Sequence, residues 1–323
     1  MLRLLFALCA ALLVAAPARA ADKVILMLNW YVYGEHAPFY YGKEKGFYTA
    51  EGIDLDIQEG RGSSMTTQAV GAGSADFGYV DIPTMMRASI RGAPVVAVGV
   101  LLQVTPMAVM SLTEKNITKP EDIKGHTLAM TPGDAVSQVW PLFLRRTGLK
   151  ESDFNVVSGD ATTKLNAVMN GQADMLLGSL MDQSMKIKDA TGKDVNVIRF
   201  ADYGINLINS GIIVRRALLD SNPDLVRRFM RASVKSVLTA EKDTAGAAQS
   251  ILNANPKGGQ FVTLKQGFEL TAPLYRLPEA HNEPFKVSDK LMEESVNLMV
   301  DYGGLDAAAR DKVASFYTND YLP

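Results

Sequence analysis

An internal repeat is the sequence feature that most constrains the fold of this chain. Gly73-Ser74-Ala75-Asp76-Phe77 recurs 98 residues later as Gly171-Gln172-Ala173-Asp174-Met175. Around each copy the order is polar loop, helix, Gly-x-Ala-Asp and apolar strand, so both copies predict the same α/β unit. In parallel α/β sheets, ligands bind at the carboxyl ends of the strands. We therefore expect residues 60–64 and 158–162, the loops before the two helices, to face one cleft.

Strand-like and helix-like segments alternate through most of the chain. Strands are expected at 24–28, 53–57, 77–80, 95–101, 127–130, 155–157, 175–177, 195–200 and 212–214. Helices are expected at 36–49, 65–71, 84–90, 135–146, 163–170, 181–189 and over most of 224–323. This order predicts an α/β fold with mostly parallel sheets. A chain of 323 residues is long enough for two such domains.

The first twenty residues have the pattern of a secretory signal peptide. Arg3 gives a positive start, residues 4–16 are apolar, and residues 18–20 form a small-x-small cleavage site. The apolar run is short for a membrane span, which argues against an uncleaved anchor. The single cysteine of the chain, Cys9, lies inside this run, which argues against a lipoprotein. We expect cleavage after Ala20 and an exported, soluble protein of the bacterial periplasm.

Composition and residue spacing narrow the classes of function. The formal net charge is −2, and removal of Arg3 and Arg19 with the signal peptide makes it −4, so nothing indicates nucleic-acid binding. Residues 21–323 contain no cysteine, which excludes disulfides and cysteine-ligated metal sites. The three histidines have no metal-ligand spacing, and no Ser/His/Asp or Cys/His arrangement is evident. We expect a binding protein with no metal, no cofactor and no catalytic residues.

Several motifs resemble those of the NMT1/THI5-like family. They are residues 29–30 (Asn-Trp), 35–41 (Glu-His-Ala-Pro-Phe-Tyr-Tyr), 43–48 (Lys-Glu-Lys-Gly-Phe-Tyr), 51–55 (Glu-Gly-Ile-Asp-Leu), 73–78 and 119–125. The resemblance implies the type II periplasmic-binding-protein fold, in which two hinge crossovers join two α/β lobes around a ligand cleft. Residues 21–106 and 207–323 would form lobe 1, and residues 107–206 would form lobe 2.

The resemblance also implies a function. The family includes receptors of ABC importers for pyrimidine precursors of thiamine, riboflavin, sulfonates, taurine, nitrate and aromatic acids. It also includes a eukaryotic enzyme that builds the thiamine pyrimidine from its own histidine and pyridoxal phosphate. That enzyme uses a cysteine-rich motif for iron, which residues 21–323 cannot supply. We expect a monomeric receptor whose partners are a small solute and an ABC transporter permease of the inner membrane.

The first group of candidate ligand-binding residues follows the first expected strand. It consists of Asn29, Trp30, Tyr31, Tyr33 and His36. Aromatic rings there would offer flat stacking faces at the edge of the cleft. The alternatives are an aromatic cluster packed under the lobe and, for His36, a ring bonded to the backbone near a helix start.

The other candidates lie in later loops. They are Arg61, Ser63, Ser64 and Asp81 in the first half, Thr131, Gly133, Asp134, Asp160, Ser179 and Asp182 in the second, and Tyr203 and Asn206 near the second crossover. Family resemblance places residues 131–135 against the ligand, where Gly133 would let the backbone approach closely. The alternatives are helix N-capping by Ser63 or Thr162 in the two repeat loops, N-capping for Asp81, Ser179 and Asp182, and a plain tight turn for residues 131–135.

The chemistry of these candidates favours a flat heteroaromatic solute. Trp30 would stack on a ring, and Asp81 and Asp160 would accept hydrogen bonds from an aminopyrimidine. An anion such as a sulfonate, nitrate or an aromatic acid would need basic residues, and Arg61 is the sole cationic candidate, so this hypothesis is second. A pyrimidine-modifying enzyme and a sensor that signals to a receptor kinase are the remaining alternatives.

Overall fold

The computed structural model describes residues 20–276 and 283–323. Arg3, Cys9 and all of the expected signal peptide except Ala20 lie outside the described residues, as does His281. Within the described part of the chain, no helix has the length and apolar character needed to cross a membrane.

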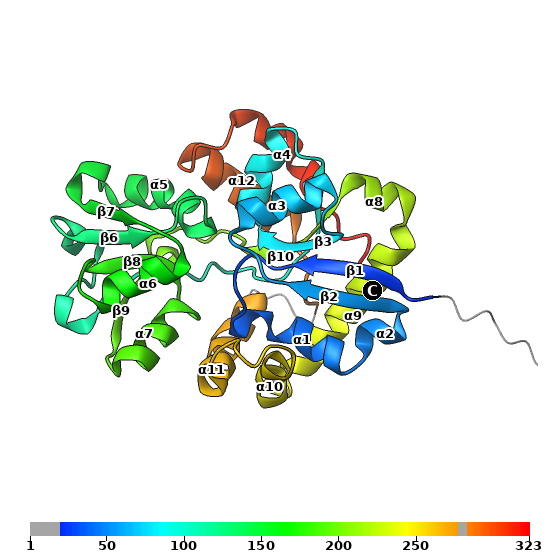
Figure 1. The fold of residues 1–323 in the computed structure, drawn as a ribbon. Coiled ribbons are helices and arrows are strands. Elements are labelled where there is room, and N and C mark those ends of the chain that lie inside the picture. Colours follow the sequence, from blue (N-terminus) through cyan, green and yellow to red (C-terminus); the bar gives the residue numbers. More distant parts are fainter. Residues whose placement is uncertain (1–19, 277–282) are drawn as a thin grey trace, which may run out of the picture.

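The strands form two five-stranded sheets with equivalent topology (Figure 1). The first sheet has the order β2-β1-β3-β10-β4, from β1 (Asp22–Met27), β2 (Ile53–Gln58), β3 (Phe77–Asp81), β4 (Val95–Val100) and β10 (Ser210–Arg215). The second has the order β7-β6-β8-β5-β9, from β5 (Met107–Leu112), β6 (Thr127–Met130), β7 (Asn155–Ser158), β8 (Met175–Ser179) and β9 (Val195–Arg199). The predicted repeat therefore corresponds to two sheets with matching strand order.

One strand of each sheet is antiparallel, which the prediction of mostly parallel sheets did not include. β10 runs antiparallel to β3 and β4, and β5 runs antiparallel to β8 and β9. β5 itself was not predicted. Its sequence, Met-Ala-Val-Met-Ser-Leu, is buried throughout like that of the predicted β4, but it is rich in Met and Ala rather than in the β-branched residues that favour strands.

The chain passes between the two sheets twice. Residues 101–106 connect β4 to β5, and residues 200–209 connect β9 back to β10. Strands β1–β4 and β10 thus belong to one sheet and β5–β9 to the other. The boundaries expected for lobe 1 (21–106 and 207–323) and lobe 2 (107–206) remain a prediction, and the two names are used below for these ranges.

Twelve α-helices of the described residues accompany the sheets (Figure 1). They are α1 (Ala37–Glu44), α2 (Phe47–Ala50), α3 (Ser63–Ala72), α4 (Ile82–Ile90), α5 (Ala135–Thr147), α6 (Ala161–Met169), α7 (Gln183–Thr191), α8 (Arg216–Ser221), α9 (Pro223–Ala240), α10 (Thr244–Ala254), α11 (Phe261–Thr271) and α12 (Asp289–Asp301). The single helix predicted over 36–49 is interrupted at Gly46. Its φ of 72° lies in the left-handed region, so α1 ends before it and α2 begins after it.

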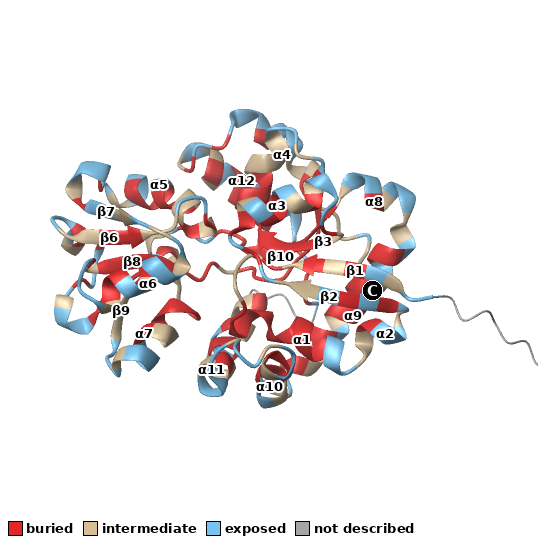
Figure 2. Ribbon diagram, in the orientation of Figure 1, coloured by how far each residue is buried: buried red, intermediate tan, exposed pale blue. Residues whose placement is uncertain are grey.

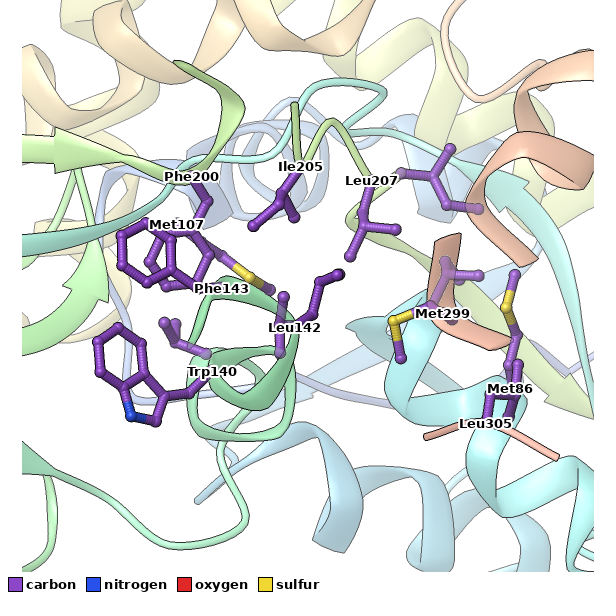
Figure 3. Packing of buried hydrophobic residues seen from close by; sticks show 14 of the residues in the cluster. Met86, Met107, Trp140, Leu142, Phe143, Phe200, Ile205, Leu207, Met299 and Leu305 are labelled. Atoms are coloured by element: carbon purple, nitrogen blue, oxygen red, sulfur yellow. The ribbon is translucent and has the colours of Figure 1, made fainter. Parts of the chain in front are cut away.

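The apolar core continues from one lobe to the other. The central strands of both sheets are buried along most of their length (Figure 2). A buried cluster joins Trp140, Leu142 and Phe143 of α5 to residues of the crossover 200–209 and to α4 and α12 (Figure 3). Contacts of this kind let α5 of lobe 2 pack against lobe 1 next to the returning crossover.

The repeated Gly-x-Ala-Asp motif performs the same structural task in both lobes. The Asp76 N–H donates to the Ile25 carbonyl (3.1 Å), and Asp76 Oδ2 accepts from the Ile25 N–H (2.9 Å). The Asp174 N–H donates to the Thr127 carbonyl (2.8 Å), and Asp174 Oδ2 accepts from the Thr127 N–H (3.0 Å). Each aspartate therefore fastens the turn before β3 or β8 to the neighbouring strand, β1 or β6.

Replacing Asp76 should show how much its hydrogen bonds to Ile25 contribute to stability. We expect Asp76→Ala to lower the free energy of unfolding by roughly 1–2 kcal/mol, because the Ile25 N–H loses its acceptor. Asp76→Asn keeps an acceptor oxygen and should lose less. Urea denaturation of the two variants measures the difference, and equal losses would contradict the assignment.

Candidate functional site

A pocket lies between the lobes, at the carboxyl ends of the strands that face each other. Its lining includes residues that follow β1, β2 and β3 and residues that follow β6, β7 and β8, and both crossovers contribute to it. The empty space, counted to its open mouth, is about 530 Å³. That volume includes solvent at the mouth, and the part open to the centre of a water-sized sphere is about 60 Å³, so the closed arrangement leaves little free space between the lobes.

Part of the expected site lines this pocket. The residues concerned are Asn29, Trp30, Tyr33, Ser63, Asp81, Asp134, Ser179 and Asp182. Lobe 1 supplies the first five and lobe 2 the last three, so the pocket exists only where the two lobes meet. Their contact with a ligand remains a prediction.

Three further expected residues join the lobes beside the pocket. The Tyr31 hydroxyl of lobe 1 donates to Asp182 Oδ2 of lobe 2 (2.6 Å). The Ser64 hydroxyl donates to the Gly133 carbonyl (3.2 Å), and Gln138 Nε2 donates to Ser64 Oγ (3.1 Å). Hydrogen bonds between lobe 1 and lobe 2 therefore flank the pocket, and they describe a closed arrangement of the lobes.

His36 lies beneath the pocket rather than in its lining. The ring is fully buried, with Nδ1 accepting from the Tyr33 N–H (3.4 Å) and Nε2 lying 2.8 Å from Asn29 Oδ1. Burial, with a smaller effect of the Lys186 charge, lowers the pKa of His36 to about 3. The neutral ring can thus donate from Nε2 to Asn29, and it holds that pocket residue in place. His36 therefore matches the alternative stated above, a ring hydrogen-bonded to the backbone near the start of a helix.

The remaining candidates lie outside the lining. Asp160 is exposed, and its side chain caps α6 by accepting from the Thr163 N–H (2.8 Å), which lowers its pKa. Tyr203 packs edge-on against Phe143 in the core, with ring centres 5.7 Å apart. Arg61 and Asn206 are exposed, and Thr131 is half-buried. Capping explains Asp160 without a ligand.

Two acidic side chains of the pocket are held by networks of hydrogen bonds. Glu35, which was not among the candidates, accepts from the Tyr33 hydroxyl (2.5 Å) and from the Tyr79 hydroxyl (2.7 Å). Burial raises the pKa of Glu35. Its place in the family motif after the first strand was the one signal that could have identified it.

Asp81 is the second buried carboxyl group. Its Oδ1 accepts from the Thr84 N–H (2.8 Å), and its Oδ2 accepts from Asn209 Nδ2 (3.1 Å), so it connects the pocket with the returning crossover. Burial raises the pKa of Asp81 to about 7 in spite of these hydrogen bonds. The N-capping alternative is confirmed for Asp81, which also lines the pocket.

Lys164 is the cationic residue of the pocket, and the sequence reasoning missed it. Only 1% of its side chain is exposed, and Nζ lies 3.3 Å from Asp134 Oδ2. The expectation that Arg61 is the sole cationic candidate is therefore wrong. A lysine in the first turn of a helix resembles a solvated residue in sequence, but the repeat aligns Lys164 with the buried Thr66. The burial of Thr66 is itself a finding of the structure, so no signal in the sequence alone identified Lys164.

Among residues 20–276 and 283–323, no group of three or more His, Cys, Asp or Glu side chains is arranged to hold a metal ion.

The two lobes, their crossovers and the pocket between them define the periplasmic-binding-protein fold, as predicted. A solved relative in fold is the alkanesulfonate-binding protein SsuA from Xanthomonas axonopodis pv. citri, with a TM-score of 0.73 and 15% identity. The match covers 93% of this chain and 99% of that one.

The chain belongs to the NMT1/THI5-like family, whose model matches residues 34–247. The riboflavin-binding protein RibY of Chloroflexus aurantiacus is 28% identical, over 96% of this chain and 90% of that protein. The formylaminopyrimidine-binding protein of Halalkalibacterium halodurans is 24% identical, over 95% of this chain and 88% of that protein. A 4-amino-5-hydroxymethyl-2-methylpyrimidine phosphate synthase of Aspergillus parasiticus is 26% identical, over 76% and 75% of the two chains.

The hydrogen bond between Tyr31 and Asp182 should favour the closed arrangement. Tyr31→Phe removes its donor, and a bond to a carboxylate worth roughly 1–2 kcal/mol corresponds to a 5- to 30-fold shift toward open forms. Small-angle X-ray scattering without ligand should show a larger radius of gyration. Tyr41→Phe is the matched control, because Tyr41 donates to Asp243 within lobe 1. Equal radii for Tyr31→Phe and the wild type would contradict the role of this bond.

Proposed function

We propose that this protein is the solute-binding receptor of an ABC importer and that it captures a small molecule by hinge closure. The observation that carries the proposal is the pocket lined by both lobes and both crossovers. Closing the lobes around a solute buries it and orders loops from both sides. A permease can then distinguish the loaded receptor from the empty one.

The preferred solute is a flat heteroaromatic compound with N–H donors, such as an aminopyrimidine. Trp30 and Tyr33 offer aromatic surface, and Glu35, Asp81, Asp134 and Asp182 offer acceptors. The relatives named for riboflavin and for formylaminopyrimidine support this class. A sulfonate or nitrate would meet these four acidic residues and a single lysine, which makes an anion the weaker candidate.

A role in binding rather than catalysis is part of the proposal. Residues 21–323 contain no cysteine, whereas the family resemblance implies that the enzyme branch uses a cysteine-rich motif for iron. The synthase named among the relatives makes the test direct. Incubation of the protein with pyridoxal phosphate and iron, followed by mass spectrometry, should yield no pyrimidine product. Detection of such a product would overturn this part of the proposal.

We place the mature protein in the periplasm, as a monomer that docks on an inner-membrane permease. The leader pattern of residues 1–20 supports this location, as do solved structures of similar fold that are described as periplasmic binding proteins. Mass spectrometry of the N-terminus after expression in a Gram-negative host should find cleavage after Ala20.

A melting-shift screen tests the proposed ligand class. Pyrimidines, flavins, sulfonates, nitrate and aromatic acids are compared with the same protein preparation. A bound solute should stabilise the fold by roughly 2.7 kcal/mol when present at a hundredfold excess over Kd. We expect the aminopyrimidines to raise the melting temperature. A rise with sulfonates and none with pyrimidines would contradict the preferred class.

The raised pKa of Asp81 gives the binding reaction a pH dependence. A solute that donates an N–H to Asp81 binds the ionised carboxylate, so its affinity should increase roughly tenfold between about pH 6 and 8. The same group acts on folding with the opposite sign. Its stabilising contribution is present at low pH and is lost as the pH rises through about 7.

Isothermal titration calorimetry across this range measures the effect on affinity. Asp81→Asn is the control, because an asparagine oxygen can still accept from the Thr84 N–H that Asp81 caps. The difference in slope between wild type and variant isolates Asp81 from any titration of the solute itself. Parallel slopes for the two proteins would show that Asp81 does not contact the solute.

A further inference from the structure

Lys164 stands out in the pocket because its charge is buried with little compensation. Its ammonium group has three N–H donors, and among the described residues Asp134 Oδ2 is its one hydrogen-bond partner, at the long distance of 3.3 Å. Asp134 divides its own hydrogen bonds, since Oδ1 accepts from the Ser137 N–H at 2.7 Å. A buried ammonium with one weak partner is costly, so a further acceptor at this place would be strongly favoured.

The position of Lys164 allows a bound solute to supply that acceptor. Lys164 lies on α6 of lobe 2 and lines the pocket, and its Nζ is 5.6 Å from the centre of the Trp30 ring of lobe 1. A solute held against Trp30 in the closed protein therefore comes within reach of the ammonium group. Asp81 and Asp182 also line the pocket, and their ionised carboxylates accept hydrogen bonds and cannot donate them.

We propose that Lys164 determines specificity by selecting solutes that carry a carbonyl or carboxylate oxygen beside their amino-bearing ring. In this arrangement carboxylates of the pocket accept from ring amino groups, and Lys164 donates to an oxygen on the substituent. This inference rests on the proposed function, because it names the chemistry of the solute in the same pocket. The formylamino group in the name of one relative's ligand is a substituent of this kind.

Two pyrimidines with matched size test the proposal. The probes are 4-amino-5-(formylaminomethyl)-2-methylpyrimidine and 4-amino-2-methyl-5-propylpyrimidine, in which the propyl group replaces the formylamino substituent. The measured quantity is the ratio of their dissociation constants for each protein variant, by calorimetry at one pH. Because both probes need the same folded protein, a loss of stability cancels in the ratio.

We expect the wild type to prefer the formyl probe, and Lys164→Met to reduce the preference roughly 10- to 100-fold, as for loss of one charge-assisted hydrogen bond. The double variant Lys164→Met, Asp134→Asn should show the same reduction. It also removes the carboxylate that the single variant would leave buried without its cation. Lys115→Met is the matched control, because Lys115 pairs with Asp174 in lobe 2 outside the lining of the pocket.

The outcomes separate this inference from the proposed function. A wild type that binds both probes equally, or a Lys164→Met protein that keeps the full preference, would overturn the role of Lys164 and leave the receptor function intact. Failure of the wild type to bind either probe, while another solute raises its melting temperature, would overturn the pyrimidine class and this inference together.

Discussion

The exchange of one strand between the two sheets is the constraint on which the rest of the structure depends. β10 pairs between β3 and β4, and β5 pairs between β8 and β9, so the chain must cross between the sheets twice. Both crossings end beside the pocket, where Met107 and Asn209 contribute to its lining. The two segments that connect the lobes therefore also contribute side chains to the pocket.

The second physical theme is the balance of charge in a pocket removed from water. Hydroxyl and amide groups donate hydrogen bonds to the buried carboxyl groups there. Tyr33 and Tyr79 donate to Glu35, and Asn209 donates to Asp81. Burial still raises the pKa of both acids, which favours their neutral forms. A hydrogen-bond donor or a cation that approaches them favours the ionised forms instead. Lys164 adds a positive charge beside these acidic groups. A solute with hydrogen-bond donors for the carboxylates and an acceptor for Lys164 would match both kinds of residue.

Sequence patterns predicted much of the fold but less of the site. The repeat and the alternation of strands and helices predicted two α/β units, because hydrophobic period and turn chemistry are local properties. The same patterns missed β5, which has a single β-branched residue, and they did not show that β5 and β10 are inserted antiparallel. Loop position at strand ends led to Trp30 and Asp81. It also led to Asp160, which caps a helix outside the pocket lining, and it overlooked Lys164.

The sequence by itself determined the family, the class of fold and the loops from which a ligand site could be built. These follow from motifs, from hydrophobic periodicity and from the order of strands and helices along the chain, all of which depend on residues close together in the sequence. Only the tertiary structure decided which side chains of those loops meet, because it joins residues far apart in the chain: Tyr31 with Asp182 across the cleft, and Lys164 with Asp134 within lobe 2. Burial at that junction, which local sequence does not encode, gives Lys164 and Asp81 their distinctive electrostatics.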